Sequence, residues 1–133
     1  RPRIPARLGR WGAQRPAIRT SLATGGERGP VSPRVWVCLR ENLTETLPNL
    51  LKHASATAFS VSISMLNKLV KASFQDNGTP ADFKPGMGLA GMEERCAMCH
   101  GRCFFSAGPN GFSTVMTFTR LNDDPYTTGG TPE

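Results

Sequence analysis

The sequence predicts a small and irregular α+β domain with an extended basic N-terminal tail, one main amphipathic helix, and a short C-terminal β-hairpin next to a cysteine cluster. Three observations predict this fold class. The chain has 133 residues, which is enough for about one domain. Its 14 glycines and 11 prolines interrupt most apolar patterns. Hydrophobic residues make up only 38% of the chain, so we expect a modest core.

Residues 1–34 form the first predicted segment, an arginine-rich tail, and residues 35–133 form the small body. The tail contains eight arginines and one acid, Glu27, which gives it a charge of +7, whereas the body carries −1. Prolines and glycines are spread along the tail, and no apolar periodicity survives between them. We therefore expect the tail to be disordered alone and to become ordered against a large partner.

The composition of the tail favours two interpretations. A dense row of arginines binds polyanions such as RNA phosphate. A segment rich in Arg, Ser and Thr without Lys is also typical of mitochondrial and chloroplast transit peptides. Trp11 lies among the arginines, where it is suited to stack on RNA bases or to anchor the tail in a protein pocket. The predicted RNA- or partner-binding residues are Arg1, Arg3, Arg7, Arg10, Trp11, Arg15 and Arg19.

The body contains four predicted elements, one of which is a short helical turn from Glu93 to Cys99 that carries the first two cysteines of the cluster. Residues 35–39 are β-branched and aromatic and predict a short strand. Apolar residues then recur at helical spacing and predict a helix over about 48–74, which begins near Pro48. Residues 59–65 offer a rival pattern, because apolar residues alternate with serines as in a half-buried strand. We favour the helix because its flanks keep the helical period. The turn sequence at 108–111 predicts the hairpin.

Residues 96–103 are the most informative part of the sequence, because three of the four cysteines and one histidine fall within them. Thiolates and imidazoles are the ligands that soft and borderline metals prefer. The C-x-x-C spacing lets two thiolates from one turn reach a single zinc ion, and we favour structural zinc. The predicted ligands are Cys96, Cys99 and Cys103, with Cys38, His53, His100 or a residue of a partner chain as the fourth.

The same residues allow other interpretations. Cys96-Ala97-Met98-Cys99-His100 has the C-x-x-C-H form of a haem attachment site, and with Gly108-Pro109-Asn110 it resembles the c-type cytochromes. The resemblance implies thioether bonds at Cys96 and Cys99, an axial ligand at His100, and an electron-transfer function. An iron–sulfur cluster, a disulfide framework, and cysteines that simply fill a core are further alternatives.

The sequence shows no catalytic constellation: it has no nucleotide-binding glycine loop, no hydrolase triad and no acid pair at a defined spacing. We therefore predict that the chain is not an enzyme and has no membrane span. The predicted function is a non-catalytic accessory subunit of a large organellar assembly in a mitochondrion or chloroplast. A ribosome is favoured, with the tail on ribosomal RNA or neighbouring proteins, and a respiratory or photosynthetic membrane complex is next. The alternative is a c-type haem electron-transfer protein.

Overall fold

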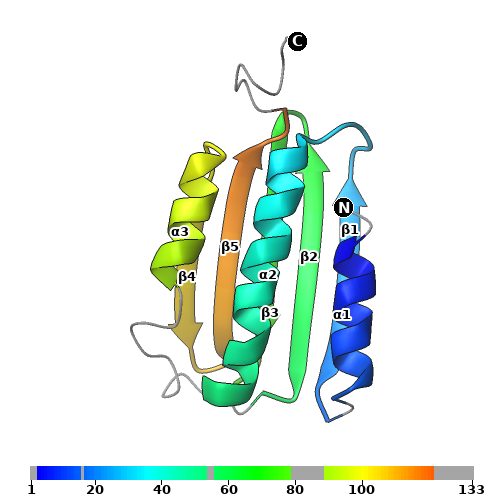
Figure 1. The fold of residues 1–133 in the computed structure, drawn as a ribbon, viewed down its shortest axis with the longest axis vertical. Helices are drawn as coiled ribbons and strands as arrows, with labels where there is room; N and C mark the ends of the chain where they lie inside the picture. The colour runs from blue at the N-terminus through cyan, green and yellow to red at the C-terminus, as the bar shows by residue number, and fades with distance from the viewer. Residues whose placement is uncertain (1–2, 16, 54–55, 79–88, 122–133) are drawn as a thin grey trace.

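The computed structural model describes residues 3–15, 17–53, 56–78 and 89–121, and within them it contains three helices and five strands (Figure 1). The helices are α1 (Arg3–Ala13), α2 (Pro33–His53) and α3 (Leu89–Met98). The strands are β1 (Arg19–Gly26), β2 (Ala58–Leu66), β3 (Leu69–Asp76), β4 (Arg102–Gly108) and β5 (Gly111–Thr119). No helix among these residues has the length and apolar character needed to cross a membrane.

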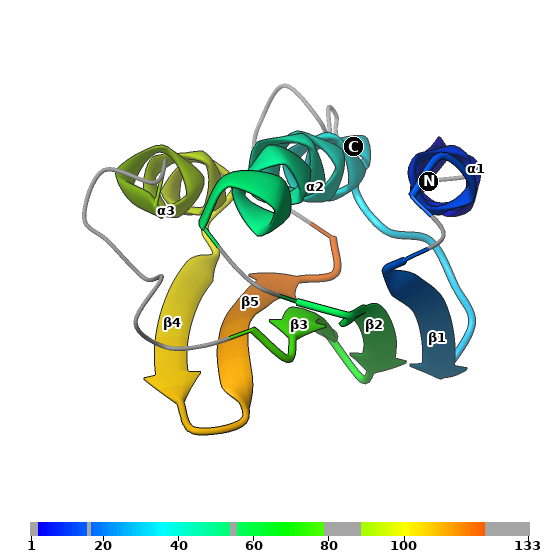
Figure 2. The same ribbon diagram turned by 90° about the horizontal axis from the view of Figure 1, so that it is seen from below.

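The five strands form one mixed sheet in the order β1-β2-β3-β5-β4. β1 and β2 run parallel, and α2 connects them, as a parallel pair requires a crossover connection. The other three strand pairs are antiparallel. The three helices lie side by side on one face of this sheet, so the domain has two layers (Figure 2). The core therefore lies between the helices and the inner face of the sheet.

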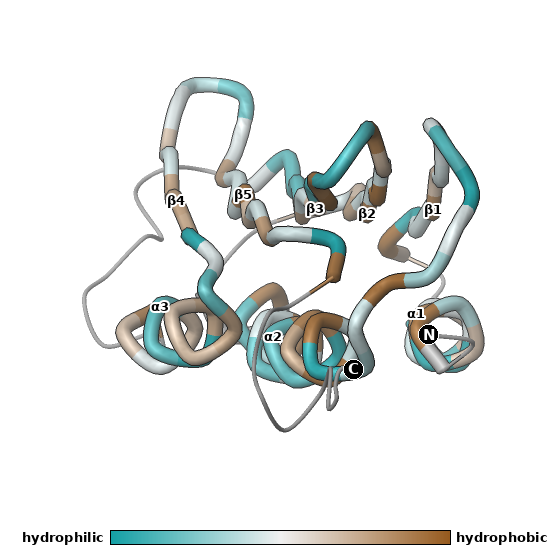
Figure 3. Tube along the Cα trace, turned by 90° about the horizontal axis from the view of Figure 1, so that it is seen from above, coloured by the Kyte–Doolittle hydropathy of each residue, from teal (hydrophilic) through white to brown (hydrophobic). Residues whose placement is uncertain are grey.

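The core is built from the apolar stripe of α2 and the inward residues of the central strands. Hydrophobic and hydrophilic residues alternate along α2 in Figure 3, as expected for a helix with one buried face. Burial of each leucine in this stripe stabilises the fold by roughly 1.5–3 kcal/mol. The largest fully buried apolar side chains are Phe59, Phe118, Leu39, Leu43, Met92, Met116, Val35, Val61 and Val70.

The predicted helix over about 48–74 is wrong, and the rival strand pattern is right. α2 ends at His53, and residues 58–66 form β2. Phe59, Val61 and Ile63 are buried, while the serines between them lie on the other face of the strand. The period-2 pattern prevails because β2 is a central strand that packs its apolar face under the helices.

The predicted strand at residues 35–39 is also wrong, because these residues lie in the first two turns of α2. Pro33 is the first residue of α2, a position where its fixed φ suits a helix and its missing N–H costs nothing. Pro48 lies inside the same helix and is exposed. Since Pro48 has no N–H to donate, the carbonyl four residues earlier loses its usual helical donor on the solvent side.

The fold class predicted from the sequence is wrong, because the structure is a regular two-layer domain with a five-stranded sheet. Residues 3–13 form α1 in place of an extended tail, and residues 19–26 form β1. Ile4 and Leu8 of α1 are both 3% exposed and belong to the core. The predicted hairpin is present as β4 and β5, with Gly108 opposite Gly111.

Candidate functional site

Two elements end at the same end of the molecule. β3 ends at Asp76 and α2 ends at His53, both at the lower edge of Figure 1. α3 begins at Leu89, higher in the same view, and runs upward, so the N-terminal end of α3 faces the lower half of the molecule. The first N–H groups of α3 have no partner within the helix, and this terminus carries the positive end of the helix dipole.

Asp76 is a buried acid that the backbone holds in place. It is 7% exposed, although it stands at the end of a strand. Its Oδ1 accepts a hydrogen bond from the Gly78 N–H at 2.8 Å and a longer one from the Phe112 N–H at 3.3 Å. No described residue donates to Oδ2. One carboxylate oxygen is thus used to fix the side chain.

Asn77 fixes the backbone that follows Asp76. Its Oδ1 accepts the N–H groups of Thr57 at 2.8 Å and Ala58 at 3.0 Å, and its Nδ2 donates to Thr57 Oγ1 at 2.9 Å. These bonds tie the end of β3 to the start of β2. The Asp76-Asn77-Gly78 segment is therefore held by hydrogen bonds to the start of β2 and to the start of β5.

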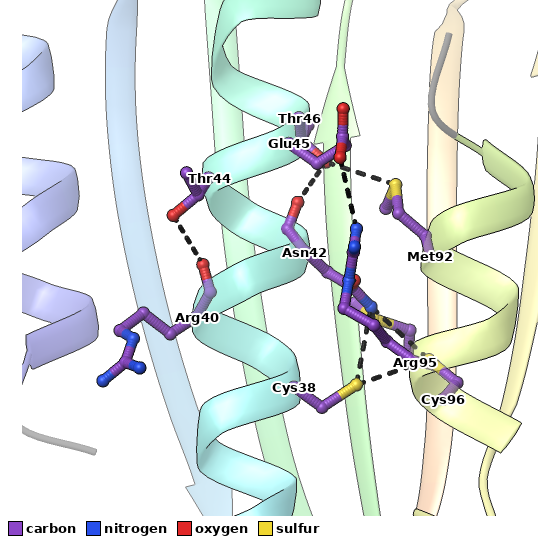
Figure 4. Close-up of polar contacts among 10 residues, drawn as sticks. Cys38, Arg40, Asn42, Thr44, Glu45, Thr46, Met92, Arg95 and Cys96 are labelled. Carbon is purple, nitrogen blue, oxygen red and sulfur yellow. Dashed lines mark hydrogen bonds and ion pairs between the residues drawn. The ribbon is translucent and has the colours of Figure 1, made fainter. Parts of the chain in front are cut away.

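Side chains of α2 and α3 meet in a contact region that we call the polar seam (Figure 4). It consists of Asn42, Glu45 and Thr46 from α2 and Met92 and Arg95 from α3. Arg95 of α3 donates from Nε to Asn42 Oδ1 at 2.7 Å, and its Nη2 lies 3.3 Å from Glu45 Oε1. Thr46 Oγ1 donates to the Asn42 backbone carbonyl at 2.8 Å and lies 3.9 Å from the Met92 sulfur. Asn42 is 0% exposed, so its bond with Arg95 satisfies an acceptor that water does not reach.

The four cysteines gather beside this seam, and all are free thiols. Cys38 comes from α2, Cys96 from α3, Cys99 from the turn after α3, and Cys103 from β4. Cys38 Sγ lies 3.8 Å from Cys96 Sγ, and Asn42 Nδ2 lies 3.5 Å from Cys96 Sγ. Cys38, Cys96 and Cys99 are buried and Cys103 is half-buried. The fold thus brings together all four predicted cysteines.

The Cys96 thiol differs electrostatically from the other three. Hydrogen bonds from the Cys103 and Cys38 thiols, supported by Asn42 and the Arg95 charge, lower the pKa of Cys96 to about 4. The hydrogen bonds to Cys96 and burial raise the pKa values of Cys38 and Cys103. Burial raises the pKa of Cys99. The arrangement is therefore one thiolate that accepts hydrogen bonds from neighbouring neutral thiols.

The predicted zinc and haem cofactors are contradicted. Among the described residues, no group of three or more His, Cys, Asp and Glu side chains is arranged to hold a metal ion. His100 is exposed, and it adopts φ +58° at the turn that ends α3. Gly101 N donates to Cys96 O at 2.8 Å and closes this turn, so the C-x-x-C-H segment serves as a helix C-terminus.

The tail arginines do not form an extended arm. Arg7, Arg10 and Trp11 lie on α1, and Arg19 begins β1. The Arg15 guanidinium stacks over the Trp11 ring at 4.8 Å, and Trp11 packs against the core. Arg3 begins α1, and Arg1 lies outside the described residues.

A second polar pocket lies away from Asp76, at the turn between β2 and β3. It has a volume of about 500 Å³, and Arg28, Asn67, Lys68 and Arg120 contribute to its lining. Arg120 Nη1 donates to Asn67 O at 2.8 Å and lies 3.2 Å from Glu27 Oε1. This pocket is cationic, so it is a second place, away from Asp76, where an anion could bind the protein.

No protein-family model and no curated protein sequence matches this chain. Solved structures do match it. The histidine kinase domain of a blue-light activated histidine kinase from Erythrobacter litoralis matches with a TM-score of 0.60 and 16% identity, over 86% of this chain and 60% of that one. The histidine kinase AdeS from Acinetobacter baumannii gives 0.64 and 16%, over 88% and 62%. The ATP binding domain of PrrB from Mycobacterium tuberculosis gives 0.61 and 19%, over 85% and 88%.

The chain has the fold of these kinase domains. It spans 60% of the first matched chain, so part of that structure has no counterpart here. The predicted non-catalytic organellar subunit, with RNA or assembly partners, is contradicted because the fold is that of catalytic and ATP-binding domains. The prediction that the chain is not an enzyme is contradicted for the same reason. A mitochondrial or chloroplast location is also contradicted, because the matched domains are bacterial.

Sequence reasoning misses the acid at the end of β3 and the glycines that precede α3 in the sequence. In the sequence, Asp76-Asn77-Gly78 indicates only the end of an element. Gly86 and Gly88 precede α3, and glycines before a helix N-terminus are a signal for phosphate binding. The cysteines within and after residues 89–98 obscure that signal, because they point to metal chemistry.

Proposed function

We propose that this chain is the nucleotide-binding catalytic domain of a histidine kinase, which binds ATP at the end of the sheet marked by Asp76. The observation that carries the proposal is the fixed, buried Asp76 carboxylate with Oδ2 left without a described donor. One of the matched structures is an ATP binding domain, and this chain shares its fold. The adenine amino group is a hydrogen-bond donor and suits this carboxylate.

The phosphates are proposed to lie at the N-terminal end of α3. This helix begins at Leu89, directly after the sequence Gly86-Met87-Gly88. A helix N-terminus that follows glycines offers backbone N–H groups and a positive dipole end to phosphate oxygens. No acidic residue stands in the first turn of α3 to oppose that charge.

Magnesium is the metal that kinase chemistry uses with ATP, and α2 offers oxygen donors that fit it. Glu45 faces α3, as its contact with Arg95 shows, and Asn49 lies one turn further along the same helix face. A carboxylate and an amide oxygen suit Mg²⁺. When bound, the ion would neutralise charge on the transferred phosphoryl group. The residues of the chain would bind the base, orient the phosphates and exclude water.

We propose that His100 is not the phosphate-accepting histidine. The other histidine of the chain, His53, is the last residue of α2. His100 follows the C-terminal end of α3, and a helix of 10 residues places it about 15 Å from the proposed phosphate position. This separation is too large for in-line transfer, which requires the reacting atoms to be in contact.

Isothermal titration calorimetry on the whole chain tests the proposal. We expect Mg–ATP to bind at one site, and Mg–GTP to bind more weakly because guanine presents a carbonyl where adenine presents an amino group. Absence of binding by the folded chain, or equal affinity for the two nucleotides, would contradict the proposed recognition by Asp76.

A further inference from the structure

The thiols of Cys38 and Cys96 face each other across the seam between α2 and α3. Their sulfur atoms are 3.8 Å apart, although 58 residues separate them in the sequence. A disulfide bond is about 2.05 Å long, so the sulfurs must approach by roughly 1.8 Å, mainly through rotation of the two side chains. Both residues sit on regular helices, which hold the two thiols opposite each other.

A surface pocket reaches one member of this pair, Cys38. It has a volume of about 280 Å³ and lies between α2 and α3, where Cys38 and Cys99 contribute to its lining with Arg34, Glu41 and Met98. Cys96 does not line the pocket and is 0% exposed. Its sulfur lies 3.8 Å from the Cys38 sulfur, so a small molecule in the pocket has to pass Cys38 to reach Cys96.

The surroundings of Cys96 favour its reaction as a nucleophile. Hydrogen bonds from Cys103, Cys38 and Asn42, together with the Arg95 charge, lower its pKa to about 4. The thiolate, not the thiol, is the species that peroxides oxidise. Cys38 keeps its proton, since its hydrogen bond to Cys96 raises its pKa, and it is therefore available as a proton donor to the reacting group.

We propose that Cys38 and Cys96 form a thiol-oxidation site, at which a small hydroperoxide such as hydrogen peroxide converts them into a disulfide that joins α2 to α3. In the first step the Cys96 thiolate attacks a peroxide oxygen, the O–O bond breaks, and a sulfenic acid and hydroxide form. In the second step the Cys38 thiol gives its proton to the hydroxide, which becomes water; the Cys38 thiolate then attacks the Cys96 sulfur, the S–O bond breaks, and hydroxide leaves. Two electrons pass from the thiols to the peroxide.

The site does not depend on the proposed nucleotide binding. Its oxidation would exchange the hydrogen bonds of Cys96 for a covalent bond and would fix α2 against α3 beside the Asn42–Arg95 contact. Cys103 and Cys99 would remain as thiols. A reductant that restores thiols would reverse the change, because a disulfide lies on the reversible part of the oxidation series.

Trypsin digestion tests this proposal directly, because arginines divide the cysteines among separate peptides. Cys38 falls in the peptide 35–40, Cys96 and Cys99 in 96–102, and Cys103 in 103–120. The folded chain is treated with hydrogen peroxide, remaining thiols are alkylated, and the digest is analysed without reduction. We expect a cross-linked 35–40/96–102 pair, lighter than its two peptides by two hydrogens, which dithiothreitol abolishes.

Variants assign the partner within 96–102. The cross-link should persist in Cys99→Ser, form more slowly in Cys103→Ser, which loses a hydrogen bond to Cys96, and be lost in Cys96→Ser, with circular dichroism used to confirm that each variant is folded. Loss of the cross-link in Cys99→Ser would overturn the assignment to Cys96. A 96–102/103–120 pair in its place would overturn the assignment to Cys38. Absence of any cross-link in the folded wild-type chain, or its formation only in urea, would overturn the proposed site as a whole.

Discussion

Gly111 lies against the backbone carbonyl of Asp76, so closely that the start of β5 leaves no space for a side chain there. Gly111 also adopts φ +130°, which L side chains rarely reach. The Phe112 N–H next to it points to Asp76 Oδ1 at 3.3 Å. The β4–β5 hairpin thus helps to fix the acid on which the proposed nucleotide site depends.

Replacement of Gly111 by alanine should destabilise the domain. The added Cβ would meet the Asp76 carbonyl, and the backbone conformation would itself be strained at a cost of roughly 1–3 kcal/mol. Urea unfolding followed by circular dichroism measures the change. Gly108→Ala is the matched control, because Gly108 is on the other side of the same turn and its Cβ would meet nothing within 4 Å. Equal stability of the two variants would contradict the close approach.

Replacement of Arg95 by methionine should destabilise the domain by about 1–3 kcal/mol, because it leaves the buried Asn42 Oδ1 without its donor. Glu45→Gln removes only the ion pair that Arg95 Nη2 forms with Glu45 and leaves the bond from Arg95 Nε to Asn42 in place. The Glu45 side chain is 42% exposed, so we expect its loss of charge to cost less than about 1 kcal/mol. Chemical denaturation of both variants checks the order. A larger effect for Glu45→Gln would contradict the account of the seam.

Cys96 should be the only one of the four cysteines that is a thiolate at neutral pH. Its pKa is lowered to about 4, so it is protonated only below that pH, whereas the other thiols have raised pKa values. The pKa of Cys96 is lower in the folded chain than in the unfolded chain, so its thiolate stabilises the fold. This contribution is complete above pH 9 and is lost as the pH falls towards about 4.

Thiolate absorption in the ultraviolet, followed by pH titration, measures the charge state of Cys96. We expect one thiolate signal that disappears as the pH falls through about 4, and that is missing in Cys96→Ser. Cys103→Ser removes the hydrogen bond with the largest effect, so it should raise the pKa of Cys96. A wild-type chain without any thiolate signal at pH 7 would refute this picture of the cluster.

Asp76→Asn should weaken ATP binding and change base preference. Asparagine keeps an oxygen for the Gly78 and Phe112 N–H groups, but it presents an amino group in place of Oδ2. That amino group opposes the amino group of adenine and suits the carbonyl of guanine. We expect ATP affinity to fall roughly 10- to 100-fold, as expected for an unpaired buried donor. Calorimetry with ATP and GTP measures both effects.

Glu94→Gln is the control for this substitution, because Glu94 is an exposed acid on α3. It removes one negative charge, as Asp76→Asn does, without touching the sheet end. An equal loss of ATP affinity in Glu94→Gln would indicate a general charge effect and not recognition of the base.

The sequence predicts local features better than their assembly. The hairpin follows from its turn residues at 108–111, and the strand pattern of 59–65 is visible but competes with a helical one. Pro33 begins α2, yet Pro48 is an equally plausible start, because both prolines suit a first helical turn. Local spacing does not decide between them, since the deciding factor is which residues the sheet buries.

The candidate site is harder to predict because its residues are distant in the sequence. Cys38 meets Cys96 only when α2 and α3 pack side by side, and Asp76 meets Phe112 only through the pairing of β3 with β5. The cysteine spacing indicates a cluster correctly. It does not indicate that the free thiols form hydrogen bonds with one another and with Asn42 and do not bind a metal.

Amide chemical-shift mapping by nuclear magnetic resonance tests the central claim most directly. The isotope-labelled chain is titrated with Mg–ATP, and the shifted amides are assigned. We predict that the shifts concentrate at Asp76, Asn77, Gly78 and the first turn of α3, and that Arg28, Asn67 and Lys68 of the distant cationic pocket remain unchanged. Shifts confined to that pocket, or no shifts at all, would contradict nucleotide binding at Asp76.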